Sequence, residues 1–110
     1  MPEKTVLEVL REARELIAVP ERWTQGGLAR DAQGKQAPGV YNRDAASWCA
    51  EGAICKTAGT FPVARAAFAA VRETLAGAEL CEFNDSHTHP EVVSLIDSTI
   101  ARLEKEADRA

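Results

Sequence analysis

Several features that define common protein classes are scarce in this chain of 110 residues. Aromatic side chains number six, and apolar stretches are only a few residues long. No stretch approaches the roughly 20 apolar residues that a membrane-spanning helix needs. No charged segment leads into an apolar run at the N-terminus, as it would in a secretory signal peptide. We therefore expect no membrane span and no signal peptide.

Cysteine is also sparse, and the three cysteines are not arranged in pairs. Cys49, Cys55 and Cys81 form no Cys-x-x-Cys motif. An odd number without short spacings is atypical of a secreted disulfide framework and fits a reducing compartment. We therefore predict a cytoplasmic protein.

Basic charge is in deficit, because 13 Lys and Arg stand against 17 Asp and Glu, for a formal net charge of −4. A general nucleic-acid binder needs a basic surface that displaces counterions, so we do not expect that function. The balance leaves room for a basic protein partner, which an acidic protein can cover by charge complementarity. The length fits a single domain, residues 1–110, with its own core.

Hydrophobic periodicity predicts four helices, over about residues 4–18, 44–58, 61–76 and 89–103. The 104–110 tail has no apolar face and is expected to fray. Residues that favour helix ends bound these segments: Pro20, Gly59, Thr60, Gly77, and a Thr88/Glu91 capping box. Gly52, in the middle of the second helix, costs about 1 kcal/mol relative to alanine, and the close approach of another backbone is the simplest reason for it.

Residues 20–42 are rich in glycine and proline and predict a loop with a small hairpin. Strands at 28–30 and 35–37 would flank a type I turn, with Gly34 in the left-handed position after it. An irregular loop is the alternative, anchored by its aromatic side chains, Trp23 and Tyr41.

A further short extended segment is predicted at 79–83, before a turn at 84–91. The fold class is therefore mainly α, or α+β: a compact four-helix domain with a small β-hairpin or short strands.

Three short motifs carry a resemblance to a known family. They are Glu21-Arg22-Trp23-Thr24-Gln25-Gly26, Trp48-Cys49-Ala50-Glu51-Gly52-Ala53, and Phe83-Asn84-Asp85 followed by Thr88-His89-Pro90-Glu91-Val92. With the helix spacing, they resemble an uncharacterised family of small bacterial and phage proteins, classed as a domain of unknown function. The resemblance runs from about Val6 to Leu103, and Phe83 stands where many such sequences have Trp. It implies a fold and a phage or mobile-element setting, and no activity.

Cys49 is a candidate nucleophile if the start of its helix or a nearby histidine lowers its pKa. His87 or His89 could act as the base, and Asn84 or Asp85 could orient it. The sequence favours the alternative, a small buried thiol beside Trp48, because it contains no nucleophile elbow and no oxyanion loop.

The aromatic motifs also suit a small-ligand pocket. Trp23, Trp48 and Phe83 would supply apolar walls, and Asn84 and Asp85 would supply polar contacts. The structural alternative is that the Asn-Asp pair hydrogen-bonds the local backbone and fixes the turn.

Four side chains near the end of the chain are of types that bind zinc: Cys81, Asp85, His87 and His89. Their Cys-x5-His-x-His spacing matches no structural zinc motif, so we expect no metal and no cofactor. The sequence thus favours a small, acidic, cytoplasmic interaction or accessory protein that binds a protein partner and is not an enzyme. A thiol-dependent hydrolase or transferase and a ligand-binding domain are the alternatives.

Overall fold

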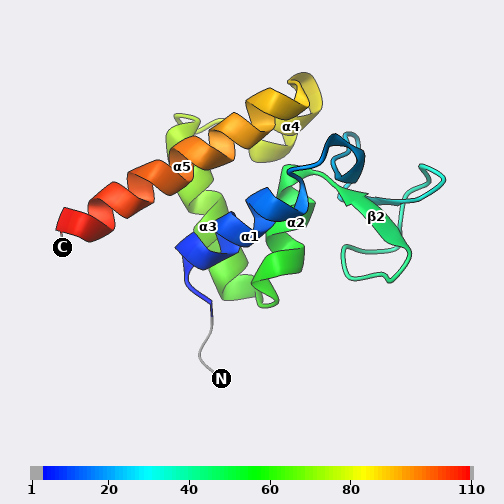
Figure 1. Cartoon of the computed structure of the whole chain (residues 1–110), viewed down its shortest axis with the longest axis horizontal. Helices are drawn as coiled ribbons and strands as arrows, with labels where there is room; N and C mark the ends of the chain where they lie inside the picture. The colour runs from blue at the N-terminus through cyan, green and yellow to red at the C-terminus, as the bar shows by residue number, and fades with distance from the viewer. Residues whose placement is uncertain (1–3, 110) are drawn as a thin grey trace.

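The computed structural model describes residues 4–109. Helices form most of this part of the chain, together with one 3-10 turn and two short strands (Figure 1). In chain order the elements are α1 (Val6–Leu16), η1 (Pro20–Arg22), β1 (Ala29–Asp31), β2 (Ala45–Trp48), α2 (Ala50–Ala58), α3 (Phe61–Thr74), α4 (Leu80–Ser86) and α5 (His89–Arg109). The mainly helical α+β class is confirmed, with five α-helices in residues 4–109 where four were predicted.

The core lies where α1 packs against α2, α3 and α5, and where α3 also contacts α5. Each of these helices turns an apolar stripe inward. Burying one such aliphatic side chain is worth about 1.5–3 kcal/mol. The largest fully buried aliphatic side chains are Val9, Leu10, Ile17, Ile54, Val71, Val92 and Ile96.

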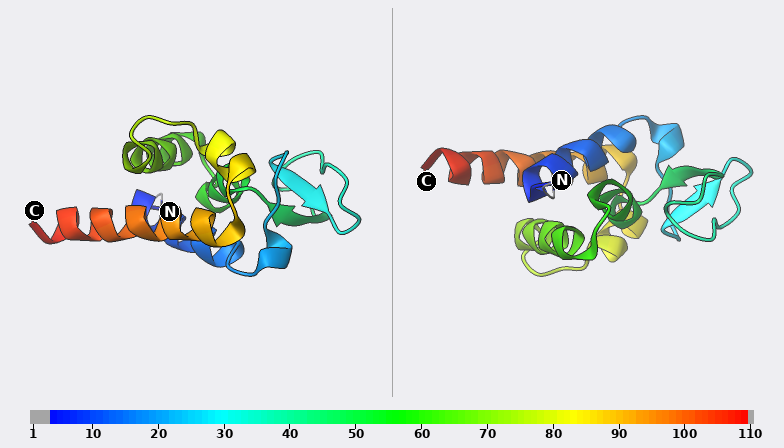
Figure 2. Two further views of the ribbon diagram at one scale, coloured as in Figure 1. Left: turned by 90° about the horizontal axis from the view of Figure 1, so that it is seen from above. Right: turned by 90° about the horizontal axis from the view of Figure 1, so that it is seen from below.

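The two strands lie at the end of the molecule opposite the C-terminus of α5 (Figure 2). β1 and β2 pair antiparallel, with Ala29 opposite Trp48. The predicted turn is confirmed, since Gly34 has a φ of 83° and the amide of Asp31 donates to Lys35 O at 2.8 Å. The predicted strand at 35–37 is wrong, because within residues 4–109 this segment forms only a single bridge, Arg30 to Gln36, and β1 pairs with β2 as its strand partner.

The prediction of helix over 44–58 is wrong in its first part. Residues 45–48 form β2, and α2 begins at Ala50 with Cys49 as its N-cap residue. The small residues of this segment suit a helix locally, but pairing with β1 and burial of Trp48 favour the strand. The Trp48 indole is 7% exposed and donates to Val40 O at 3.0 Å.

The prediction of an extended segment over 79–83 is also wrong, because α4 begins at Leu80. Leu80 and Asn84 are both buried, and a helix places residues four apart on one face. Asn84 and Asp85 therefore lie in a helix and not in the predicted turn.

Local predictions at two other points are confirmed. The amide of Thr88 donates to Glu91 Oε1 at 2.9 Å, and the amide of Glu91 donates to Thr88 Oγ1 at 3.4 Å, which makes the predicted capping box. A Cβ at position 52 would collide with the carbonyl oxygen of Leu28, so the reason inferred for Gly52 is correct.

α5 continues as a helix to Arg109, and its C-terminal end projects past the other helices (Figure 1). Glu104 forms an ion pair with Arg11 of α1, with 2.6 Å between Oε2 and Nη2. Fraying of this tail stays a prediction, and Ala110 lies outside the described residues. Of the described helices, none has both the length and the apolar content needed to cross a membrane.

Candidate functional site

The predicted binding residue Asn84 is fully buried, and its side chain makes four hydrogen bonds. Its Oδ1 accepts from Trp23 Nε1 at 2.7 Å and from the amide of Ala50 at 3.0 Å. Its Nδ2 donates to Thr24 O at 3.0 Å and to Asp85 Oδ1 at 3.2 Å. Every donor and acceptor of the amide is therefore used within the protein.

The loop that carries Trp23 is held against α4 by further bonds. Gln25 Nε2 donates to the carbonyl oxygens of Asn84 at 3.0 Å and His87 at 2.9 Å. The amide of Gly26 donates to Asp85 Oδ1 at 2.9 Å. Asn84 and Asp85 thus join α4, the 23–26 loop and the start of α2, which favours an architectural role for the pair.

The candidate nucleophile Cys49 is 3% exposed. Its Sγ accepts a hydrogen bond from the amide of Gly52 at 3.3 Å, as an N-cap side chain does. Burial nevertheless raises the pKa of the Cys49 thiol to about 11. At neutral pH the group is therefore a protonated thiol, and only the thiolate is a nucleophile.

The two candidate bases are engaged elsewhere. His87 Nδ1 lies 2.9 Å from Phe83 O, and its ring stacks on Phe83 with centroids 3.7 Å apart. His89 Nε2 lies 2.6 Å from Ile17 O, so this nitrogen carries the proton. Within residues 4–109 neither imidazole hydrogen-bonds Cys49, and the described chain contains no group of three or more His, Cys, Asp or Glu that could hold a metal ion.

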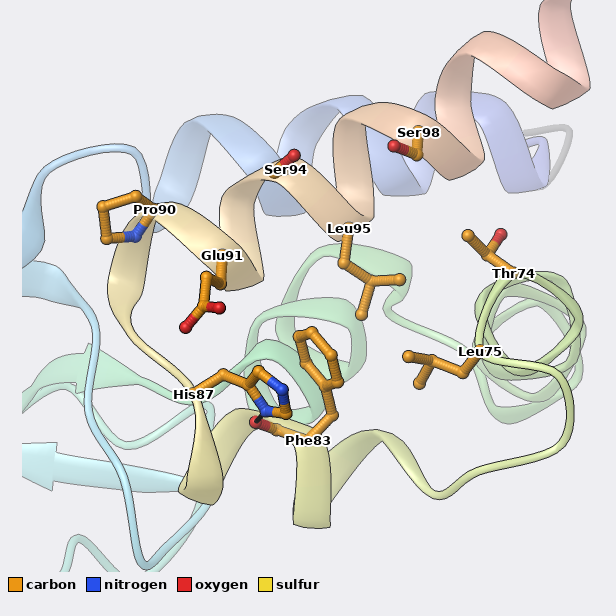
Figure 3. A pocket seen from close by; sticks show the side chains of 9 residues that line it. All are labelled: Thr74, Leu75, Phe83, His87, Pro90, Glu91, Ser94, Leu95 and Ser98. Carbon is orange, nitrogen blue, oxygen red and sulfur yellow. Dashed lines mark hydrogen bonds between the residues drawn. The ribbon is translucent and has the colours of Figure 1, made fainter.

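Phe83 and His87, two of the predicted site residues, line a shallow groove of about 520 Å³ between α5 and the end of α3 (Figure 3). Figure 3 shows the Phe83 and His87 rings side by side beneath α5, with the Glu91 carboxylate above them. We call this the Phe83–His87 groove. Trp23 and Trp48 are not among its lining residues, which are Thr74, Leu75, Phe83, His87, Pro90, Glu91, Ser94, Leu95 and Ser98.

A second groove, of about 370 Å³, lies between the 28–41 loop and the junction of α2 with α3. Among the described residues, four large hydrophobic side chains are exposed, and three of them lie here: Leu28 (46%), Tyr41 (60%) and Phe61 (67%). We call it the apolar groove. Its lining is Leu28, Val40, Tyr41, Cys55, Gly59, Thr60, Phe61 and Ala64.

Backbone contacts hold the rim of the apolar groove in place. The Tyr41 hydroxyl donates to Cys55 O at 2.6 Å. Leu28 O accepts from the amide of Cys49 at 3.3 Å and packs directly on Gly52. Gly59, with a φ of 75°, ends α2 and turns the chain so that Phe61 begins α3. The exposed side chains thus project from ordered backbone.

Sequence reasoning did not single out the apolar groove. Phe61 continues the spacing of the apolar stripe of α3, which predicts burial. It is exposed because it is the first residue of the helix and lies beyond the elements that cover the rest of the stripe. No local pattern distinguishes these two outcomes.

Comparison with known proteins identifies a family. A family model described as a family of unknown function, DUF6197, matches residues 1–102. The chain belongs to the DUF6197 family. The DUF6197 match includes the Asn84 network and the full lining of both grooves. No curated protein and no solved structure matches the chain.

Proposed function

We propose that this DUF6197 chain is a small protein-binding module and that the apolar groove is its docking surface. The observation that carries the proposal is the exposure of Leu28, Tyr41 and Phe61 around one cavity. Apolar patches with polar surroundings are typical of interaction sites, and aromatic side chains are enriched at interface centres. Covering these three side chains would provide the main hydrophobic gain on binding.

The state of the thiols supports a role in binding over one in catalysis. Cys49 is buried, and the raised pKa of its thiol keeps it protonated at neutral pH. A thiol-dependent hydrolase or transferase would therefore need a rearrangement that frees Cys49, together with His87 or His89, from their present contacts.

A small-ligand site is the second candidate function. The stacked rings of Phe83 and His87 and the nearby Glu91 carboxylate give the Phe83–His87 groove both an apolar surface and polar groups. A compound that binds here only in the folded state would raise the melting temperature. A thermal-shift screen in which Phe83→Ala abolishes every stabilising hit would support this site, and a screen without hits would count against it.

We further propose a cytoplasmic accessory protein of a phage or mobile element. The small size, the acidic balance and the free cysteines, Cys49, Cys55 and Cys81, support this setting. Neighbouring genes for capsid, nuclease or defence proteins would be consistent with it, whereas a neighbourhood of metabolic enzymes would contradict it.

Photocrosslinking in the native host tests the docking surface. A benzophenone amino acid at position 61 lies on the groove rim, and the same probe at Val19 is a matched control, because Val19 is 47% exposed and does not line the groove. We expect one protein adduct from position 61, none of the same mass from position 19, and loss of the adduct when Leu28→Ser is added. Adducts that are identical at both positions, or that persist with Leu28→Ser, would overturn the proposal.

A further inference from the structure

We infer that the apolar groove binds an acidic protein segment, in which apolar side chains are flanked by Asp or Glu. This inference rests on the proposed function and adds the chemistry of the partner. The observations that carry it are the distribution of charge over the chain, the pairing of the cations, and the position of two cations next to the groove.

Charge is distributed unevenly along the chain. Residues 20–65 contain six basic and four acidic side chains, whereas residues 66–110 contain four basic and nine acidic ones. All the lining residues of the apolar groove lie between 28 and 64. The negative balance of the whole chain therefore comes mainly from α4 and α5, and the segment that forms the groove is net positive.

The cations of the two regions also differ in their partners. In the described part of the chain, the basic residues that form salt bridges are Lys4, Arg11, Arg14, Arg72 and Arg102. None of the cations from residues 20–65 is paired with a carboxylate within residues 4–109. These charges are available to a partner without breaking an internal ion pair.

Two of these unpaired cations lie beside the groove. The Arg65 guanidinium is 4.8 Å from the ring centroid of Phe61, which lines the groove. Lys56 follows Cys55, a lining residue, and its Nζ is 5.4 Å from the ring centroid of Trp48, whose indole donates to the carbonyl oxygen of the lining residue Val40.

The Glu51 carboxylate lies near the same groove. Burial and the charge of Glu51 together raise the pKa of the Cys55 thiol, which lines the groove. The summed charge of these three groups is still positive, because Arg65 and Lys56 are cations and Glu51 is the single anion among them.

A carboxylate of the partner gains more here than at an ordinary exposed lysine. Arg65 is held over the Phe61 ring, so part of its conformational entropy is already lost before an ion pair forms. Guanidinium also offers two parallel hydrogen bonds to one carboxylate. Apolar side chains that fill the groove would exclude water beside this pair and strengthen it.

The net charge of the whole chain favours a basic partner, but the charge at the apolar groove has the opposite sign. Surface charges are screened beyond about 8–10 Å at physiological salt, so contacts at the groove depend on nearby groups. The acidic side chains of α4 and α5 therefore do not determine what the groove accepts.

A peptide display library tests this chemistry. The probe is a set of 12-residue peptides with every position randomised, selected on the full-length protein. We expect enriched peptides to combine large apolar residues with flanking Asp or Glu, and to lose binding to Leu28→Ser/Phe61→Ser. Neither substituted side chain belongs to the buried core, so the variant keeps the core intact.

A charge reversal provides the matched control. Lys56→Glu/Arg65→Glu should weaken a selected acidic peptide about tenfold, since each close exposed pair turned from attraction to repulsion changes binding several-fold. Lys105→Glu/Arg109→Glu makes the same change in net charge at the projecting end of α5 and should leave affinity unchanged (Figure 1). Affinity is measured by fluorescence anisotropy.

The outcomes separate this inference from the proposed function. Groove-dependent peptides without acidic residues, or equal effects of the two charge reversals, would overturn the acidic partner and leave the docking surface standing. Enrichment that is unaffected by Leu28→Ser/Phe61→Ser, or no enrichment at all, would overturn both.

Discussion

The Trp23 indole donates a 2.7 Å hydrogen bond to the side-chain oxygen of Asn84, which lies 61 residues further along the chain. The same oxygen accepts from the amide of Ala50, the first residue of α2. One buried amide therefore joins the three segments that carry the family resemblance: the Trp23 loop, the Trp48 motif and the Phe83-Asn84-Asp85 motif. Their shared presence in the sequence has an architectural explanation.

Replacing Asn84 should destabilise the fold strongly. Asn84→Leu keeps the branched shape of the side chain but leaves Trp23 Nε1, the Ala50 amide and Thr24 O without their partner. We expect a loss of about 3 kcal/mol in the free energy of unfolding, because each buried group left unsatisfied costs about 1–3 kcal/mol. Urea denaturation measures it, with the exposed Ser94→Ala as control; a loss below about 1 kcal/mol would contradict the role of Asn84.

Gly52→Ala should also destabilise the protein, against the intrinsic preference of a helix for alanine. That preference alone predicts a gain of about 1 kcal/mol. Here the new methyl group would collide with Leu28 O, and the resulting shift of backbone should cost about 1–3 kcal/mol net. Gly39→Ala is the control, since a Cβ there meets nothing within 4 Å. Thermal denaturation compares the two, and a stabilised Gly52→Ala protein would refute the close contact.

The three thiols should react with iodoacetamide in order of their exposure. Cys81 is exposed, Cys55 is half-buried, and Cys49 is buried with a thiol pKa raised to about 11. At pH 8 we expect Cys81 to be alkylated first and Cys49 to be protected until the protein unfolds. Peptide mass spectrometry reads out each site. If Cys49 were labelled faster than Cys81, the result would contradict the buried thiol and support the hypothesis of a thiol-dependent enzyme.

The same thiol makes stability depend on pH in the alkaline range. Burial raises the pKa of Cys49 from an ordinary value of 9.0 to about 11 in the folded state. The unfolded chain therefore loses this proton first, so stability is unaffected below about pH 9 and falls as the pH rises toward 11. The Cys49 thiol alone should lower the free energy of unfolding by roughly 2–3 kcal/mol over this pH range. Cys49→Ala should show a correspondingly smaller alkaline loss in urea denaturation at pH 8 and pH 11, and equal losses would contradict the buried thiol.

Features with local causes could be predicted from the sequence. The Thr88/Glu91 capping box and the left-handed Gly34 turn each depend on residues within a few positions. The close contact at Gly52 was predictable because glycine destabilises a helix relative to alanine, and close approach of another backbone explains its presence. Residues 45–48 could not be assigned correctly, because their strand exists only through pairing with β1, which begins 16 residues earlier. The prediction for 79–83 failed for a related reason, since Leu80 and Asn84 define a buried helical face only against their partners in other elements.

The sequence by itself determined that this chain is mainly helical and carries a glycine-rich turn region, since periodicity and turn chemistry are local properties. It also contains the three motifs that carry the family resemblance. The tertiary structure alone decided that Asn84 is an internal connector, that Cys49 is buried, and that Leu28, Tyr41 and Phe61 meet at one exposed groove. The physical reason is that burial and proximity depend on how distant segments pack, and no residue's own neighbours in the chain specify that.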